Sequence, residues 1–152
     1  MAEPDHVFPV RVYYEDTDAA GIVYYANYLK FAERARTEWL RAKGVGQRDL
    51  SEKEGVAFAV RRVSVEYLMP ARLDDALEVR TRIVAVRGAS LDGEQEITRD
   101  GQVLARLALT LACVAHTGRP ARLPEMVRRA LGLVSPQFHK NNDKRTKREV
   151  HG

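Results

Sequence analysis

One long amphipathic segment, residues 25–43, constrains the fold of this chain more than any other feature. Its apolar side chains recur at spacings of three and four residues, so they form one stripe along a helix of about five turns. Gly44 and Gly46 predict the helix end, because glycine tolerates the left-handed backbone found there. A helix with one apolar face needs a second layer to cover it. The apolar stripe consists of Tyr28, Phe31, Ala32, Ala35, Trp39 and Ala42.

The remainder of the chain predicts a sheet that can form this second layer. Short helices are expected at residues 47–54 and 125–131, and Asp100-Gly101 is a two-residue hairpin signal. One long helix and about five strands, mostly antiparallel, predict an α+β domain. Local patterns do not give the order of the strands. Runs rich in β-branched or aromatic residues predict these strands at residues 7–14, 57–67, 77–86, 90–99 and 103–115.

The chain has 152 residues, which fits a single domain, here predicted over residues 1–134. Residues 135–152 carry five Lys or Arg and two acidic residues, so this tail holds +3 of the net charge of +4. Its lack of apolar periodicity predicts a basic, disordered tail. Such a tail could touch an anionic membrane surface, although an inert solvated end is preferred and no nucleic-acid partner is expected.

Cysteine usage and the N-terminal residues predict a cytoplasmic protein. The single cysteine, Cys113, cannot form an internal disulfide, and residues 1–9 lack the basic and apolar regions of an export signal. The four histidines are scattered without metal-ligand spacing. We therefore expect no metal and no other cofactor.

Residues 12–28 place two carboxylates and a glycine between a strand-like run and a helix-like run. Asp16 and Asp18 approach a helix N-terminus, whose unpaired N–H groups and positive dipole end can polarise a carbonyl. Gly21 could supply a positive φ or let a ligand approach the backbone. This combination fits an acyl-transfer site, in which a carboxylate acts as nucleophile or general base and the helix end stabilises the oxyanion. The alternative is that both Asp residues are ordinary turn and capping residues.

Three motifs carry a resemblance to a known family: residues 11–41 (RVYYEDTDAAGIVYYANYLKFAERARTEWLR), 65–75 (VEYLMPARLDD) and 86–90 (VRGAS). They resemble the hot-dog-fold acyl-CoA thioesterases, specifically the YbgC-type, tol-pal-associated branch close to the 4-hydroxybenzoyl-CoA thioesterases. This resemblance implies a sheet wrapped round the long central helix. It also implies a homo-oligomer in which two protomers join their sheets edge to edge, with active sites at that interface. Such dimers often pair again into homotetramers.

The resemblance also implies roles for two residues of the first motif. Asp18 matches the catalytic carboxylate, and the backbone N–H of Tyr25 matches the amide that polarises the substrate carbonyl. The YbgC branch commonly carries His where this chain has Tyr25, whereas the hydroxybenzoyl branch carries Tyr. A histidine is not required as general acid, because a thiol with a pKa near 8.5 leaves readily as thiolate.

Coenzyme A calls for basic and hydroxyl groups that can hold its phosphates. By resemblance Arg87 and Ser90 match the nucleotide-binding corner, and Arg119 or Arg122 matches the basic loop after the last strand, while Gly21 completes the predicted substrate site. The expected activity is hydrolysis of an acyl-CoA thioester to a free carboxylic acid and coenzyme A, with the thioester as substrate rather than cofactor. The alternative is a non-catalytic scaffold that binds acyl-CoA or an acyl carrier protein.

Overall fold

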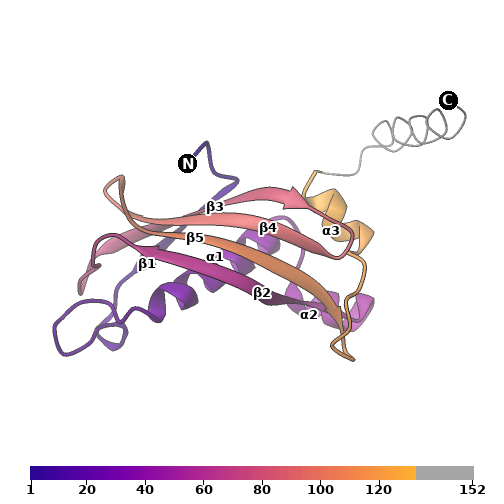
Figure 1. Cartoon of the computed structure of the whole chain (residues 1–152), viewed down its shortest axis with the longest axis horizontal. Helices are drawn as coiled ribbons and strands as arrows, with labels where there is room; N and C mark the ends of the chain where they lie inside the picture. Colours follow the sequence, from indigo (N-terminus) through magenta and orange to yellow (C-terminus); the bar gives the residue numbers. More distant parts are fainter. Residues whose placement is uncertain (133–152) are drawn as a thin grey trace, which may run out of the picture.

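The computed structural model describes residues 1–132, and in it one long helix lies along one face of a single curved sheet (Figure 1). This helix, α1 (Asn27–Ala42), begins two residues later than predicted. Its entry consists of tighter turns, in which the N–H groups of Asn27 and Leu29 donate to the carbonyls of Tyr24 and Ala26 at 2.8 and 3.2 Å. Helix α1 is therefore continuous with a short turn that starts at Tyr24.

The sheet has five strands in the order β1-β3-β4-β5-β2, and every neighbouring pair is antiparallel. The prediction of an α+β domain is confirmed. Strands β1 and β2 form the two edges of the sheet. The strands are β1 (His6–Arg11), β2 (Val56–Tyr67), β3 (Ala76–Val86), β4 (Ser90–Arg99) and β5 (Gln102–Ala115).

Short helical segments connect these elements. The predicted strand over residues 7–14 is wrong at its end, because the strand stops at Arg11 and residues Tyr14–Asp16 form the 3-10 turn η1. Helix α2 (Gln47–Asp49) and the π-helical turn η2 (Leu50–Glu54) follow α1, and α3 (Glu125–Ala130) follows β5. The predicted basic tail from residue 135 lies outside the described residues. Among residues 1–132, no helix combines the length and apolarity that a membrane span requires.

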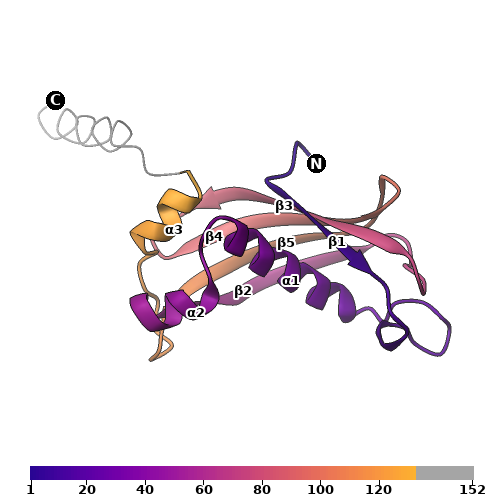
Figure 2. The ribbon, with the colours of Figure 1, turned by 180° about the vertical axis from the view of Figure 1, so that it is seen from behind.

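The core lies between α1 and the concave face of the sheet (Figure 2). Phe31 near the start of α1 packs in one buried cluster with Ile97 of β4, and Trp39 near its end packs in a second cluster with Val127 of α3. Side chains of β5 alternate between the two faces of the sheet, as the sequence predicts. Those at Ala105, Leu107, Leu109, Leu111 and Cys113 are buried.

Candidate active site

Residues 12–26 connect β1 to α1, and backbone hydrogen bonds hold this loop against the connection between β2 and β3. The N–H of Val12 donates to the Asp75 carbonyl at 3.0 Å, and the N–H of Asp74 donates back to the Val12 carbonyl at 3.0 Å. At the other end of the loop, the N–H of Val23 donates to the Ala71 carbonyl at 2.8 Å. The loop therefore has a fixed base, because both of its ends are held by one segment of chain.

Asp16 ties the loop to the start of α1. Its carboxylate accepts the N–H of Tyr13 at 2.8 Å. This is the capping role that the sequence analysis gives as the alternative for Asp16. Its carbonyl accepts two further bonds, from the N–H of Tyr24 at 3.0 Å and from the side-chain amide of Asn27 at 2.8 Å. The carboxylate of Asp16 is thus used within the turn, and Asn27 is a site-building residue that the sequence did not reveal.

Asp18 lies at the exposed tip of the loop. Its Oδ1 accepts the N–H of Ala20 at 2.8 Å, while its carbonyl accepts the N–H of Gly21 at 3.0 Å. Gly21 has φ +77°, and a Cβ there would meet nothing within 4 Å, so the backbone conformation rather than crowding favours glycine. Within residues 1–132 nothing donates a hydrogen bond to Oδ2 of Asp18, which leaves this oxygen available for chemistry.

Two backbone amides at the entry to α1 are also available. The N–H groups of Tyr25 and Ala26 donate to no acceptor in the described part of the chain, and Ala26, the N-cap residue of α1, makes no side-chain cap bond. They precede a helix of 16 residues, whose dipole places partial positive charge at this end. The predicted donor, the Tyr25 N–H, is therefore present, and the Ala26 N–H lies beside it in the chain.

A cluster of tyrosines surrounds this helix entry. The hydroxyl of Tyr67, the last residue of β2, donates to the Tyr25 carbonyl at 3.0 Å. The hydroxyl of the buried Tyr28 accepts the N–H of Ala71 at 2.9 Å. A phenol keeps its proton at neutral pH, and burial raises the pKa of Tyr67 and of Tyr28 further. Tyr67 can therefore act as a hydrogen-bond donor.

The residues predicted to bind coenzyme A lie at a different place, the corner between β3 and β4. Arg87 is exposed, and its guanidinium donates to Oδ2 of Asp92 at 2.7 Å. That hydrogen bond, with a second from the Thr110 hydroxyl, lowers the pKa of Asp92 to about 2. Ser90 is buried, whereas Arg122 is exposed. Arg87 can reach a phosphate only by sharing or leaving Asp92.

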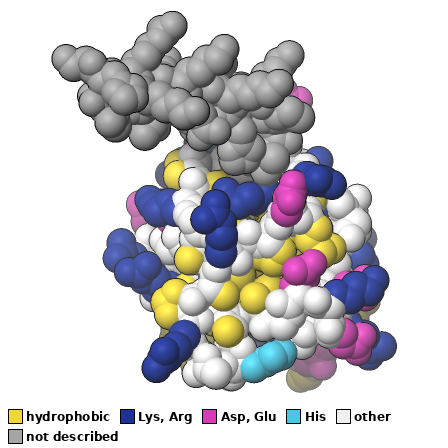
Figure 3. Space-filling model, turned by 90° about the vertical axis from the view of Figure 1, so that its right-hand side faces the viewer, with side chains coloured by type: hydrophobic (Ala, Val, Ile, Leu, Met, Phe, Trp, Pro, Cys, Tyr) yellow, Lys and Arg dark blue, Asp and Glu magenta, His cyan; other side chains and the backbone are white. Residues whose placement is uncertain are grey.

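Helix α3 braces this corner. One Nη of Arg128 donates to the carbonyls of Arg87 and Gly88 at 3.1 and 3.2 Å. The N–H of Leu123 donates to the Gly88 carbonyl at 2.9 Å as well. At this end of the molecule, charged side chains of both signs, with many Lys and Arg, border an apolar area (Figure 3). Arg128 is a second residue that the sequence did not reveal, because its contacts depend on how α3 folds back.

The two halves of the predicted site lie at opposite ends of the sheet. The chain that follows Tyr67 bonds to the Leu104 carbonyl through the N–H of Leu68 at 2.8 Å, whereas the β3–β4 corner is bonded to Cys113 through the Ala89 carbonyl at 2.8 Å. Leu104 and Cys113 are nine positions apart along β5, which is about 30 Å of extended strand. A single chain therefore does not bring Asp18 together with the coenzyme A residues.

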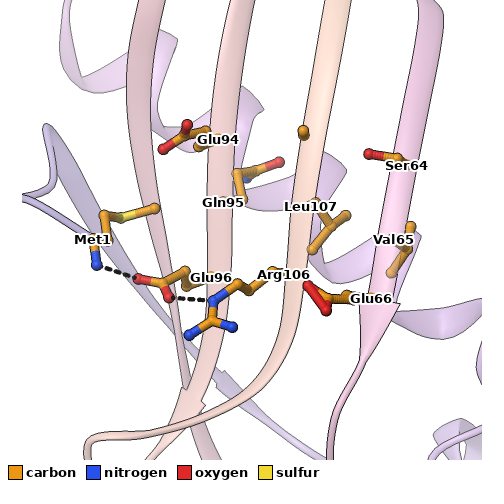
Figure 4. Close-up of a pocket in the computed structure, with 10 residues that line it drawn as sticks. Met1, Ser64, Val65, Glu66, Glu94, Gln95, Glu96, Arg106 and Leu107 are labelled. Atoms are coloured by element: carbon orange, nitrogen blue, oxygen red, sulfur yellow. Dashed lines mark hydrogen bonds and ion pairs between the residues drawn. The ribbon is translucent and has the colours of Figure 1, made fainter.

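The hollow shown in Figure 4 is a separate feature of about 370 Å³. Its charged lining includes Glu94, Glu96 and Arg106, which alternate along β4 and β5 with the side chains that face α1. Glu96 is nearly buried, and its carboxylate pairs with Arg106 at 3.3 Å and with the N-terminal ammonium of Met1 at 3.4 Å. Asp18 does not line this hollow.

The turn that holds the loop has its own anchor, and its contribution can be measured. Asp75 accepts the N–H of Arg72 at 2.8 Å and the Arg99 guanidinium at 2.6 Å. Burial alone would raise the pKa of Asp75, but the Arg72 N–H and the Arg99 guanidinium outweigh it, so the net shift is downward from 3.8. Because the pKa is lower in the folded state, this carboxylate stabilises the fold above its ordinary pKa and loses that effect as the pH falls through the folded value.

We expect Asp75→Asn to lower the free energy of unfolding at pH 7 by about 1.5 kcal/mol, because an amide replaces the ionised partner of Arg99. Urea denaturation of both proteins at pH 7 and pH 3 measures the difference. The difference in free energy of unfolding between the wild type and Asp75→Asn should be smaller at pH 3 than at pH 7. Asp74→Asn is the matched control, because Asp74 has φ 69°, which asparagine tolerates. An equal gap at both pH values would contradict the assigned role of the ionised carboxylate.

A single antiparallel sheet packed on one long helix is the architecture of the thioesterase structures that this chain resembles, the hot-dog class. The chain belongs to the thioesterase-like superfamily, whose family model matches residues 12–131. The predicted family and fold are confirmed. Among residues 1–132, no group of three or more His, Cys, Asp or Glu side chains is placed to hold a metal ion.

Individual relatives agree with this assignment. The chain is 44% identical over 131 residues to the acyl-CoA thioesterase YbgC of Haemophilus influenzae, covering 86% of this chain and 96% of that protein. It is 48% identical over 122 residues to the acyl-CoA thioester hydrolase YbgC of Escherichia coli, and the match covers 79% of this chain and 90% of that protein. A Thermus thermophilus thioesterase solved with coenzyme A and Zn matches with a TM-score of 0.73 at 32% identity, and the match covers 86% of this chain and 93% of that protein.

Proposed function

We propose that the protein hydrolyses acyl-CoA thioesters to a free carboxylic acid and coenzyme A. The observation that carries the proposal is one loop that presents an exposed carboxylate, Asp18, seven residues before a helix entry at Tyr25, where two N–H groups donate to no acceptor within residues 1–132. The similarity to acyl-CoA thioesterases of the YbgC type supports the choice of substrate class. A cytoplasmic location is part of the proposal, because the only cysteine cannot form an internal disulfide.

In the proposed reaction Asp18 supplies the attacking oxygen or activates it. As nucleophile, its carboxylate attacks the carbonyl carbon, the C–S bond breaks, and water then hydrolyses the mixed anhydride. As general base, it takes a proton from a water molecule that attacks instead. In both cases coenzyme A leaves with the electron pair of the C–S bond, and the Tyr25 N–H stabilises the oxyanion. One well-placed donor of this kind contributes about 3 kcal/mol.

We propose that the smallest active unit is a homodimer formed through β2. This edge strand is exposed along most of its length, and Val60 and Val63 are 50% and 39% exposed in the single chain. Antiparallel pairing of two β2 strands would place the Tyr67 end of one protomer near the Val56 end of its partner. That arrangement would bring Asp18 of one chain to Arg87, Ser90 and Arg122 of the other. A homotetramer would be a pair of such dimers.

A panel of acyl-CoAs, from short aliphatic to long-chain and aromatic, tests the activity directly. The purified protein is expected to release thiol from at least one member, and the rates across the panel identify the acyl group. Tight binding of acyl-CoA with no hydrolysis of any member would indicate the alternative, a non-catalytic acyl-CoA or acyl-carrier scaffold. Gly21 contributes to the proposed site through its positive φ, which gives the Asp18 loop its shape.

The role of the corner residues in holding coenzyme A gives a separate prediction. Arg87→Ala should raise KM for acyl-CoA about tenfold, because a charge-assisted contact to phosphate is lost. The variant and the wild type should hydrolyse an S-acyl pantetheine equally, because that substrate lacks the nucleotide. Arg41→Ala is the control, since Arg41 is exposed on α1 and pairs with Glu38. A parallel loss on both substrates would remove Arg87 from nucleotide binding.

A further inference from the structure

The carbonyl of Tyr25 lacks the partner that a regular helix would give it. In an α-helix this carbonyl accepts the N–H of residue 29, but the N–H of Leu29 donates to the Ala26 carbonyl at 3.2 Å instead. The N–H of Tyr28 reaches the Tyr25 carbonyl only at 3.4 Å. The shortest bond to this carbonyl comes from the Tyr67 hydroxyl, at 3.0 Å. A side chain 42 residues away therefore holds the helix entry.

Tyr67 approaches from the end of β2, and its ring is held as well as its hydroxyl. It packs edge-on against the ring of Tyr25, with centroids 6.2 Å apart, and against the ring of Tyr28, with centroids 5.4 Å apart. Aromatic pairs at these separations are attractive in this geometry. Replacing Tyr67 with phenylalanine would keep the ring contacts and remove only the hydrogen bond.

We propose that Tyr67 is a positioning residue for the oxyanion donors of this site, an inference that rests on the proposed thioesterase function. The Tyr25 carbonyl and the Ala26 N–H belong to one planar peptide group, so the phenol that holds the carbonyl also fixes the direction of this N–H. A donor on the carbonyl also polarises the peptide and strengthens its N–H as a donor. The Tyr25 N–H lies on the preceding peptide plane, and its direction depends on the same anchored residue. The edge strand of the sheet thus sets the geometry of the helix entry.

Steady-state kinetics of Tyr67→Phe test this role. We expect kcat to fall three- to tenfold with KM unchanged, because the donors act on charge that develops only in the transition state. Tyr28→Phe is the matched control: it removes a hydroxyl from the same cluster, but one that accepts the Ala71 N–H in the core. This control should lower the melting temperature and leave kcat within about twofold. A wild-type kcat in Tyr67→Phe, or an equal loss in both variants, overturns the proposal.

An NMR measurement separates this inference from the proposed function. The Ala26 amide proton should move upfield in Tyr67→Phe, because its peptide loses a donor at the carbonyl, and should move far less in Tyr28→Phe. An unmoved Ala26 resonance overturns the positioning role whatever the activity. If the wild type hydrolyses no acyl-CoA, the proposed function fails, and a shifted Ala26 resonance would still support the control of this amide by Tyr67.

Discussion

Asp18→Asn is expected to lower kcat about 10³-fold on any acyl-CoA that the wild type hydrolyses. The asparagine amide oxygen can still accept the Ala20 N–H that Oδ1 accepts at 2.8 Å, so the turn should keep its shape. An amide can neither form the mixed anhydride nor take a proton from water, and both proposed mechanisms therefore stop. Thiol release at saturating substrate measures the change.

Asp16→Asn is the matched control for this variant, because it makes the same chemical change two residues earlier. The Asp16 carboxylate accepts the Tyr13 N–H within the turn, and an amide oxygen can replace it there. We expect less than a tenfold loss of kcat, together with a melting temperature close to that of the wild type in both variants. Unchanged turnover in Asp18→Asn would remove Asp18 from the mechanism, and an equal loss in both variants would indicate a structural effect on the loop.

The elements of the fold were predictable because their signals are local. The three- and four-residue spacing of apolar side chains predicts α1, and alternation along residues 103–115 predicts the buried face of β5. An aromatic residue favours extended structure, so the sequence predicts Tyr14 within the first strand. In the fold, the contact between the Asp16 carboxylate and the Tyr13 N–H closes a 3-10 turn instead. A short polar side chain thus outweighs strand propensity over three residues.

The order of the strands could not be predicted, because it depends on contacts between distant parts of the chain. Strand β2 pairs with β5 rather than with β3, its neighbour in sequence, and Tyr67 lies opposite Ala105. Strand β1 pairs with β3, which places His6 opposite Thr81. No periodicity within either strand encodes these partners. The edge position of β2, on which the proposed dimer depends, emerges only from the structure.

The candidate site also has a part that local sequence predicts and a part that depends on distant contacts. Asp18, Gly21 and the helix entry lie within one short segment, so the sequence could place them together. The roles of Tyr67 and Arg128 could not be predicted, because each side chain donates a hydrogen bond to a carbonyl about 40 residues away in the chain. The available signal for Tyr67 was its position in the VEYLMP run just before a proline, which indicates a strand end but not its partner.

The second large effect is expected on the proposed homodimer. Val63 lies on the edge strand β2 and is 39% exposed in the single chain, and lysine on an edge strand opposes pairing with another strand. Val63→Lys should therefore yield monomers by analytical ultracentrifugation. It should also lower kcat/KM at least 100-fold, because Asp18 loses the coenzyme A corner of the partner. A Val63→Lys protein that is monomeric and fully active would contradict a site shared between chains.

Val84→Lys controls for the added charge. Val84 is 51% exposed but belongs to β3, which β4 and β5 separate from the edge strand β2. This variant should keep the oligomeric state and the activity of the wild type. If Val84→Lys lost the dimer and Val63→Lys kept it, the interface would lie on the outer face of the sheet rather than at its edge.

Mixing two inactive or weakened proteins tests the shared site without disturbing the interface. In a dimer of one Asp18→Asn chain and one Arg87→Ala chain, one of the two sites carries both changes and the other carries neither. After subunit exchange, half of the dimers are mixed, so activity at low substrate should reach about a quarter of the wild-type value. If Asp18 and Arg87 of the same chain formed each site, every site would stay impaired and mixing would restore nothing. The recovery therefore reports directly whether the loop of one protomer works with the corner of its partner.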